Sequence, residues 1–179
     1  MERWGEKSSL TGNVFDGAKW SSEDEYTVVL ELAKPSSLTL EILASPSMAA
    51  GIMPKEVIDS ASVEGVNEYI GTGPFKFEEW KDSQYIHFKK FDEYKPVDIE
   101  ADGLTGKKEA LVDDLYIYIV PDTSTRLAGM RSGEYHVAYD IPLDQYETLQ
   151  NEPDLSAIAL QNAFAVVTFN TVEGLANNF

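Results

Sequence analysis

The sequence predicts a mixed α/β (α+β) protein, in which strands and helices follow one another along a single chain. Segments rich in β-branched and aromatic residues alternate with short segments that begin at serine, aspartate or proline, which is typical of mixed folds. Hydrophobic residues make up 43% of the chain and charged residues 25%, a composition that allows a packed core. A length of 179 residues corresponds to one domain or slightly more.

The first third of the chain is expected to hold one strand and two short helices. Ser36 or Ser37 can cap the first of these helices, and Pro54 stands at a suitable first position for the second. The expected elements are the end of a helix at residues 2–8, a polar segment at 9–24, a strand at 26–32, and helices at 36–43 and 55–61.

The middle of the chain is expected to form most of a sheet. Phe75 and Phe77 fall on one face of the first strand, because side chains alternate along a strand. Residues 115–120 are apolar or aromatic on both faces, so we expect this strand to be covered on both sides. The expected elements are a turn at 71–74, strands at 75–80 and 85–91, a polar loop at 92–109 and a strand at 115–120.

Five aromatic residues gather around the first two of these strands, and packing within the hairpin is the interpretation we favour over ligand contact. They are Phe75, Phe77, Trp80, Tyr85 and Phe88.

The last third is expected to alternate helices and strands. Asp122 or Thr123 can cap a helix that runs to about Ser132, and Gly133 is suited to end it. Further along, we expect strands at 135–139, 155–160 and 164–170, and a helix at 142–151.

Charge excludes two classes of partner. The chain has 31 acidic and 14 basic residues, which gives a net charge of −17. Nucleic acids and anionic membrane surfaces both require clustered cations, so neither is an expected partner. No apolar run approaches the roughly 20 residues that a membrane span needs, so no transmembrane segment is expected.

The chain contains no cysteine, which fits an exported bacterial protein. Glu2 and Arg3 follow Met1 where a signal peptide would have a basic and then an apolar segment. If the protein is exported, this chain is expected to be an internal piece of a longer one.

One acidic segment is similar to a calcium-binding loop. Asp98–Glu109 has oxygen-bearing side chains at alternate positions, a glycine at the bend and a final glutamate. Three residues oppose a calcium site: Glu100 is bulky at the third position, Thr105 is polar at the eighth, and Pro96 precludes a normal entering helix. We expect a solvated loop here, with no metal and no cofactor. The histidines, His87 and His136, are expected to be structural or surface residues.

A family resemblance rests on Glu68–Trp80, which reads EYIGTGPFKFEEW. This string strongly resembles the signature of the extracellular solute-binding proteins of the peptide/oligopeptide/nickel class (family 5), which serve bacterial ABC importers. Further segments resemble the family's motifs in the same order: Asp24–Leu30 with Lys34-Pro35, Ile52–Glu56, Lys89–Tyr94, Pro121–Tyr135 and Phe169-Asn170. The chain departs from the pattern at His136, where the family has aspartate.

The resemblance implies a two-lobed periplasmic-binding-protein-like fold with a mixed sheet flanked by helices. Residues 1–69 would be the late part of a smaller extra subdomain of the first lobe. Residues 70–162 would belong to the mixed-sheet part of that lobe, and 163–179 to the crossover toward a second lobe. The chain would then be an internal fragment of the whole receptor.

The resemblance also implies binding without catalysis. A solute, most simply a peptide, would be held between lobes that close by hinge motion and would pass to an ABC permease. The protein would be extracytoplasmic, either periplasmic or a cell-surface lipoprotein. The residues that would contact solute are Ser45, Ser47, Met48, Asn162 and Phe164.

Gly71, Gly73 and Pro74 are expected to form a structural turn, with a positive φ angle at one of the two glycines.

Two other functional classes stay open at this point. One is an acidic metal-assisted hydrolase that uses the loop Asp98–Glu109, and the other is a structural or adhesive surface module.

Overall fold

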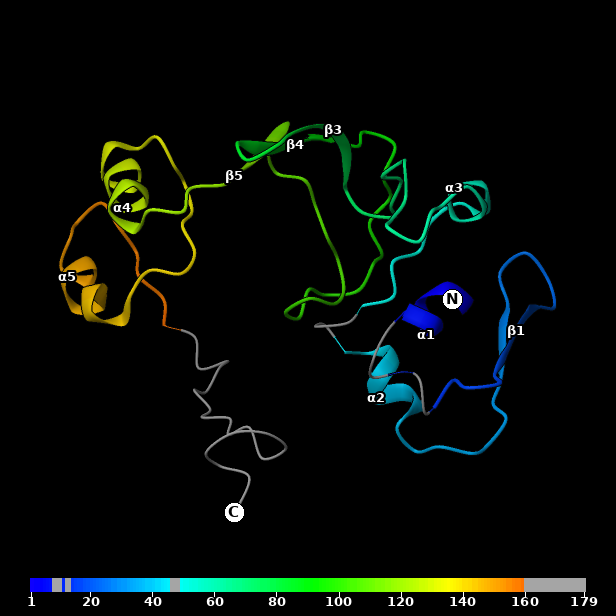
Figure 1. Ribbon diagram of the computed structural model, residues 1–179. Coiled ribbons are helices and arrows are strands. Elements are labelled where there is room, and N and C mark those ends of the chain that lie inside the picture. Colours follow the sequence, from blue (N-terminus) through cyan, green and yellow to red (C-terminus); the bar gives the residue numbers. More distant parts are fainter. Residues whose placement is uncertain (8–10, 12–13, 46–48, 160–179) are drawn as a thin grey trace, which may run out of the picture. The chain divides into compact units, whose positions relative to one another are not determined.

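The computed structural model describes residues 1–7, 11, 14–45 and 49–159 of the chain. The chain divides into two compact units, Met1–Ile119 and a second unit that begins at Val120. The elements of the first unit are α1 (Glu2–Lys7), β1 (Lys19–Ser22), β2 (Val28–Glu31), α2 (Thr39–Leu43), α3 (Lys55–Asp59), β3 (Phe75–Lys81), β4 (Tyr85–Lys90) and β5 (Asp114–Tyr118). Those of the second are α4 (Thr123–Ser132), the short 3-10 helix η2 (Leu143–Gln145) and α5 (Tyr146–Gln150) (Figure 1).

A small antiparallel hairpin joins β1, which lies in the segment 9–24 that was expected to be polar and without an element, to β2. The carboxylate of Asp24 closes its turn, since Oδ1 accepts the backbone N–H groups of Tyr26 and Thr27, both at 2.8 Å. These bonds hold the pKa of the Asp24 carboxyl below its ordinary value. The strand predicted at 26–32 is confirmed over the shorter range of β2, and β1 was missed because its sequence, KWSS, carries little strand propensity.

The two helices predicted after this hairpin are present but shorter. α2 begins at Thr39 and has Leu38 as its N-cap, so the prediction of a cap at Ser36 or Ser37 is wrong. The hydroxyl of Ser36 instead accepts the backbone N–H of Leu38, at 3.3 Å, in the turn before the helix. Pro54 is extended and precedes α3 rather than starting it, and α3 buries Val57.

A three-stranded antiparallel sheet, in the order β3-β4-β5, is the central feature of the first unit (Figure 1). All three strands were predicted. β3 contains a bulge at Glu78, since Phe77 pairs with Phe88 and Glu79 pairs with His87, the next residue along β4.

The pairing defines two faces of this sheet, because directly opposed residues project to the same side. We call one the apolar face, which carries Phe77, Trp80, Ile86, Phe88, Leu115 and Ile117. We call the other the tyrosine face, which carries Glu79, Tyr85, His87, Tyr116 and Tyr118.

The expected aromatic packing is present, but it is divided between these faces. On the apolar face, Phe77 meets Phe88 with ring centroids 6.1 Å apart, and Tyr69 lies against both Phe77 and Trp80. Tyr85 is not part of that cluster, because it packs against Tyr116 on the tyrosine face, 5.5 Å away.

The expectation that the third strand is covered on both faces is wrong for the described residues. All five residues of β5 are exposed, and Tyr118 is 51% exposed. β5 forms one edge of the sheet and pairs with β4 alone. Its side chains pack against those of the neighbouring strand β4, as Tyr116 and Tyr118 do against Tyr85, and they remain exposed on both faces.

The second unit begins with the helix that was predicted most completely. Asp122 caps α4, where its Oδ1 accepts the backbone N–H of Thr125 at 2.7 Å. Gly133 ends α4 in the left-handed conformation, with φ of 75°. Arg131 on α4 forms an ion pair with Glu152, which follows α5 (Nη2 to Oε1, 2.6 Å).

The helix predicted at 142–151 is present as η2 followed directly by α5. No strand forms at 135–139 or at 155–159, so these two predictions are wrong over the described residues. A strand needs a hydrogen-bonded neighbour, and no strand is present in the described part of this unit to supply one. The strand predicted at 164–170 lies outside the described residues.

Candidate functional site

The residues predicted to contact solute are mostly outside the described part of the chain. Ser47, Met48, Asn162 and Phe164 belong to segments that the structure does not describe. Ser45 is half-buried just after α2, and its backbone N–H donates to the carbonyl of Ile42 at 3.2 Å. The grouping of these five residues into one site stays a prediction.

The turn at Gly71, Gly73 and Pro74 differs from its prediction in one respect. Neither glycine has a positive φ angle, so the expectation of a left-handed residue there is wrong. A Cβ atom built on either glycine would meet nothing within 4 Å. The residue before a proline favours extended conformations, which accounts for the geometry of Gly73. The carbonyl of Pro74 accepts the backbone N–H of Phe91 at 2.9 Å and ties the start of β3 to the end of β4.

The acidic loop at 98–109 is shaped by backbone hydrogen bonds. Asp102 and Thr105 exchange backbone bonds of 3.2 and 2.9 Å around Gly103, which has φ of 55°. Glu109, the residue at the final ligand position, pairs with Lys107 at 2.9 Å. Within the described ranges, no three His, Asp or Glu side chains gather as they would around a metal ion.

The two histidines have the structural and surface roles expected of them. His87 is buried on the tyrosine face, and its Nε2 lies 2.7 Å from Oδ1 of Asp114 on the neighbouring strand. Its ring stacks on Tyr116 with centroids 4.1 Å apart and an interplanar angle of 4°. His87 therefore joins β4 to β5, whereas His136 is exposed in the second unit.

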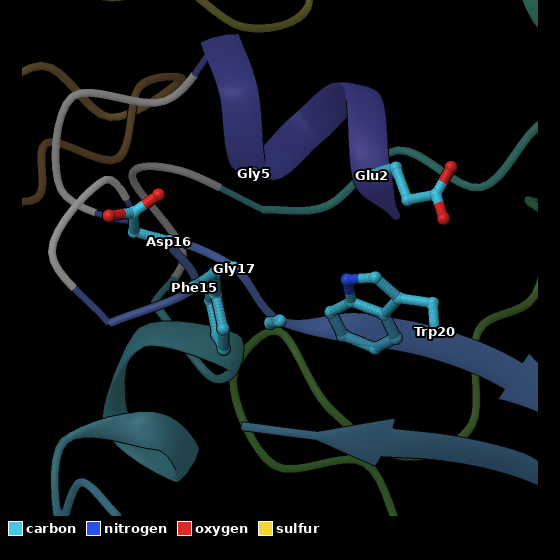
Figure 2. Close-up of a pocket in the computed structure, with 7 residues that line it drawn as sticks. Glu2, Gly5, Phe15, Asp16, Gly17 and Trp20 are labelled. Carbon is cyan, nitrogen blue, oxygen red and sulfur yellow. The ribbon is translucent and has the colours of Figure 1, made fainter. Parts of the chain in front are cut away.

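A pocket that the sequence did not reveal lies between α1 and the start of β1 (Figure 2). Its volume is about 390 Å³. Aromatic, acidic and small residues line it: Glu2, Gly5, Phe15, Asp16, Gly17, Ala18 and Trp20. We call it the α1–β1 pocket. The signal that could have indicated it is the pair of aromatic residues Phe15 and Trp20 within an otherwise polar segment.

Local contacts give the α1–β1 pocket a defined base. Phe15 is only 8% exposed, and its ring lies 5.6 Å from Trp4 and 5.9 Å from Trp20, centroid to centroid. The buried Thr11 donates from Oγ1 to the carbonyl of Gly5 at 2.6 Å, and its own carbonyl accepts the N–H of Phe15 at 2.9 Å. Helix α1 and the segment before β1 are thereby joined beneath the pocket.

Comparison with known proteins places the chain in a family. The family described as bacterial extracellular solute-binding proteins, family 5 middle, matches residues 2–178. This chain belongs to that family. The family resemblance expected from the segment Glu68–Trp80 is thus confirmed over nearly the whole chain.

Curated relatives of this family 5 chain are named for solutes. The glutathione-binding protein GsiB of Salmonella paratyphi A is 29% identical over 143 residues, which cover 79% of this chain and 25% of the relative. A Sinorhizobium fredii protein, named a probable peptide ABC transporter periplasmic-binding protein (y4tO), is 29% identical over 147 residues, 80% of this chain and 27% of that protein. The family 5 chain therefore spans about a quarter of the length of the relatives it matches.

Solved structures of periplasmic binding proteins share the fold. DppA of Helicobacter pylori, in complex with the peptide STSA, has a TM-score of 0.59 and 25% identity, over 75% of this chain and 25% of that one. AgaA of A. tumefaciens R10, in complex with agropinic acid, has a TM-score of 0.65 and 25% identity, over 82% of this chain and 28% of that one. The fold of the family 5 chain is therefore part of a two-lobed periplasmic-binding-protein fold.

Proposed function

We propose that this chain belongs to a receptor that captures a peptide or similar small solute and delivers it to an ABC import permease. The match to family 5 over residues 2–178 is the observation that carries this proposal. The names of the relatives support it, since they include a glutathione-binding protein, a peptide transporter component and a receptor solved with a bound tetrapeptide. The proposed role is binding without a chemical step.

The proposed arrangement gives this chain one wall of a solute cleft. The segments that contain Ser45 and Met48, and Asn162 and Phe164, would line that wall with small, amide and apolar side chains. None of these side chains is charged, so contacts from this wall would be hydrogen bonds and apolar packing. Residues 1–69 would belong to a smaller extra subdomain of the first lobe, 70–162 to its mixed-sheet part and 163–179 to the crossover.

The proposed location is outside the cytoplasm, in the periplasm or on a cell-surface lipoprotein. In the described ranges, no helix is long and apolar enough to cross a bilayer. The net charge of −17 fits a protein that meets its solute in water rather than on an anionic membrane.

Calorimetric titration tests the proposed function. The natural protein that carries this chain is titrated with a pool of di- to pentapeptides, with glutathione and with nickel, and we expect saturable binding of a peptide-class solute. The chain of residues 1–179 is titrated in parallel, and we expect no measurable binding, because contacts on one open wall stay solvated and add little net free energy.

Two substitutions test the proposed wall. Met48→Ala and Phe164→Ala are expected to weaken binding by the natural protein, whereas Met53→Ala, a methionine outside the proposed wall, is expected to leave it unchanged. Failure of every peptide to bind, or release of cleaved peptide during the titration, would contradict the receptor proposal. Cleavage would favour a hydrolase instead.

A further inference from the structure

The α1–β1 pocket combines two chemical features that are usually found together where proteins hold organic cations. It has an aromatic wall, made by Trp20 and Phe15, and it has carboxylates, from Glu2 and Asp16. Aromatic faces and carboxylates both attract positive charge, and the aromatic face also accepts an apolar body. None of the described residues that line this pocket is basic.

We propose that the α1–β1 pocket binds a small aliphatic amine with an ammonium group at each end. Figure 2 shows the side chains of Glu2 and Asp16 at opposite ends of the group of lining residues, with Phe15 and Trp20 to one side of the line that joins the two carboxylates. A short apolar chain lying over the two rings would bring one ammonium group toward each carboxylate. The proposed site uses none of the residues assigned to the solute cleft, so it stands independently of the proposed function.

The carboxylates are available for such a ligand. Glu2 and Asp16 are both exposed, and within the described residues neither has a hydrogen-bond or ion-pair partner. The surrounding protein adds to the attraction, because the whole chain carries a charge of −17.

The backbone keeps the pocket open. Gly17 has φ of 69°, a conformation that side-chain-bearing residues rarely adopt, and a Cβ atom there would lie 3.4 Å from Cβ of Ala33. A Cβ atom on Gly5 would lie 3.8 Å from Cβ of Phe15. With Ala18, these glycines line the pocket without side chains that would occupy it.

The expected affinity is modest. Both carboxylates are solvated, and exposed ion pairs and cation–π contacts each contribute little. Dissociation constants of roughly millimolar size are therefore expected, and they should weaken as salt screens the charges.

The test uses 1,4-diaminobutane as the probe and follows the indole N–H signal of Trp20 by two-dimensional NMR, assigned with Trp20→Phe. We expect a saturable shift with diaminobutane, at least about fivefold weaker binding of n-butylammonium, and no saturable shift with 1-pentanol or with magnesium chloride at equal ionic strength. If 1-pentanol binds as tightly as diaminobutane, the pocket recognises only the apolar chain. If magnesium binds as tightly as diaminobutane, the pocket attracts any cation. Either outcome, or no shift at all, would overturn the proposal.

Paired variants separate the local carboxylates from the net charge. The double variant Glu2→Gln/Asp16→Asn is expected to weaken diaminobutane binding at least about tenfold. Its control, Glu68→Gln/Asp92→Asn, changes the net charge equally at exposed carboxylates elsewhere and is expected to bind within about twofold of the parent chain. If both double variants lose affinity to the same extent, the pocket is not the site. Circular dichroism of each variant verifies that the fold is kept.

Discussion

Two glycines test whether a turn requires glycine for its backbone conformation: Gly106 has a positive φ angle, whereas Gly71 does not. A Cβ atom on Gly106 would lie 2.2 Å from the carbonyl oxygen of Glu100, and Gly106 has φ of 74°. We expect Gly106→Ala to lower the melting temperature, since both the clash and the left-handed backbone oppose a side chain. Gly71→Ala is the matched control and should melt near the parent temperature. Equal melting of the two variants would show that the loop at 98–109 shifts to admit a side chain.

The His87–Asp114 pair is expected to stabilise the contact between β4 and β5. Asp114→Ala leaves the Nε2 atom of the buried His87 without this partner, which should cost about 1–3 kcal/mol of the free energy of unfolding. Chemical denaturation measures the cost, and Asp113→Ala, at the adjacent exposed residue, is the control. If Asp114→Ala lowers the free energy of unfolding no more than Asp113→Ala does, water takes the place of the carboxylate as the partner of His87 Nε2.

Acid should weaken the cap of α4. The backbone N–H of Thr125, followed by its hydroxyl, holds the pKa of the Asp122 carboxyl below its ordinary value. A carboxyl with a lowered folded-state pKa adds stability above its unfolded value, near about 4, and this stability is lost as pH falls through the folded value. We therefore expect Asp122→Ala to melt below the parent chain at pH 7, with the difference shrinking as the solution is acidified below about pH 4.

Asp122→Asn tests the same idea from the other side, because an amide can cap the helix without titrating. Its melting temperature should therefore fall less on acidification than that of the control Asp92→Ala, which keeps the titrating carboxylate of Asp122. A constant difference between Asp122→Ala and the parent across all pH values would exclude the carboxylate as the cause.

The sequence predicts residue roles that depend on near neighbours and misses those that depend on distant ones. Asp122 and Gly133 were identified as caps, because a cap is set by a few adjacent residues. The pairing of His87 with Asp114, 27 residues away, gives no such local signal. The same holds for the α1–β1 pocket, where Glu2 meets residues that follow it by more than ten positions.

Helices and strands differ in how far the sequence determines them. α4 forms within its own segment, since each of its backbone bonds joins residues close in sequence. The segment at 135–139 has alternating apolar residues yet forms no strand, because its unit offers no strand to pair with in the described residues. The solute cleft stays a prediction, because four of its five residues, Ser47, Met48, Asn162 and Phe164, lie outside the described residues.

The packing of α4 against the segment that follows it depends on a glycine, Gly129, at the point of contact. Gly129 is buried in α4, and a Cβ atom there would lie 2.4 Å from the Tyr135 ring. Alanine favours helices over glycine, yet we expect Gly129→Ala to lower the free energy of unfolding by about 1–3 kcal/mol, because overpacking outweighs propensity.

A double variant identifies the cause of that loss. In Gly129→Ala/Tyr135→Ala the smaller side chain at position 135 removes the clash. Introducing alanine at position 129 should therefore lower the free energy of unfolding less in the Tyr135→Ala variant than in the parent chain. If Gly129→Ala raises the stability of the otherwise unchanged chain, the ring moves aside freely and this packing argument is wrong.

At the scale of the whole molecule, the excess of acidic residues should oppose compaction. With 31 acidic and 14 basic residues, repulsion extends over about 30 Å in 0.01 M salt and about 8 Å in 0.15 M salt. We expect the melting temperature of the chain to rise between these two salt concentrations, as measured by differential scanning calorimetry. A fall would mean that ion pairs such as Arg131–Glu152 outweigh the repulsion.

The bulge at Glu78 shifts the register of β3 against β4 by one residue. Its one extra residue places Trp80 opposite Ile86 on the apolar face, and Glu79 opposite His87 on the tyrosine face. If Glu78 instead paired with His87, the bulge would be absent and the rest of β3 would shift by one residue, presenting the indole of Trp80 to the tyrosines and the carboxylate of Glu79 to the phenylalanines. In evolutionary terms, this stretch should accept the loss of the one bulged residue more readily than the insertion of another, because the loss restores regular pairing with Trp80 still opposite Ile86.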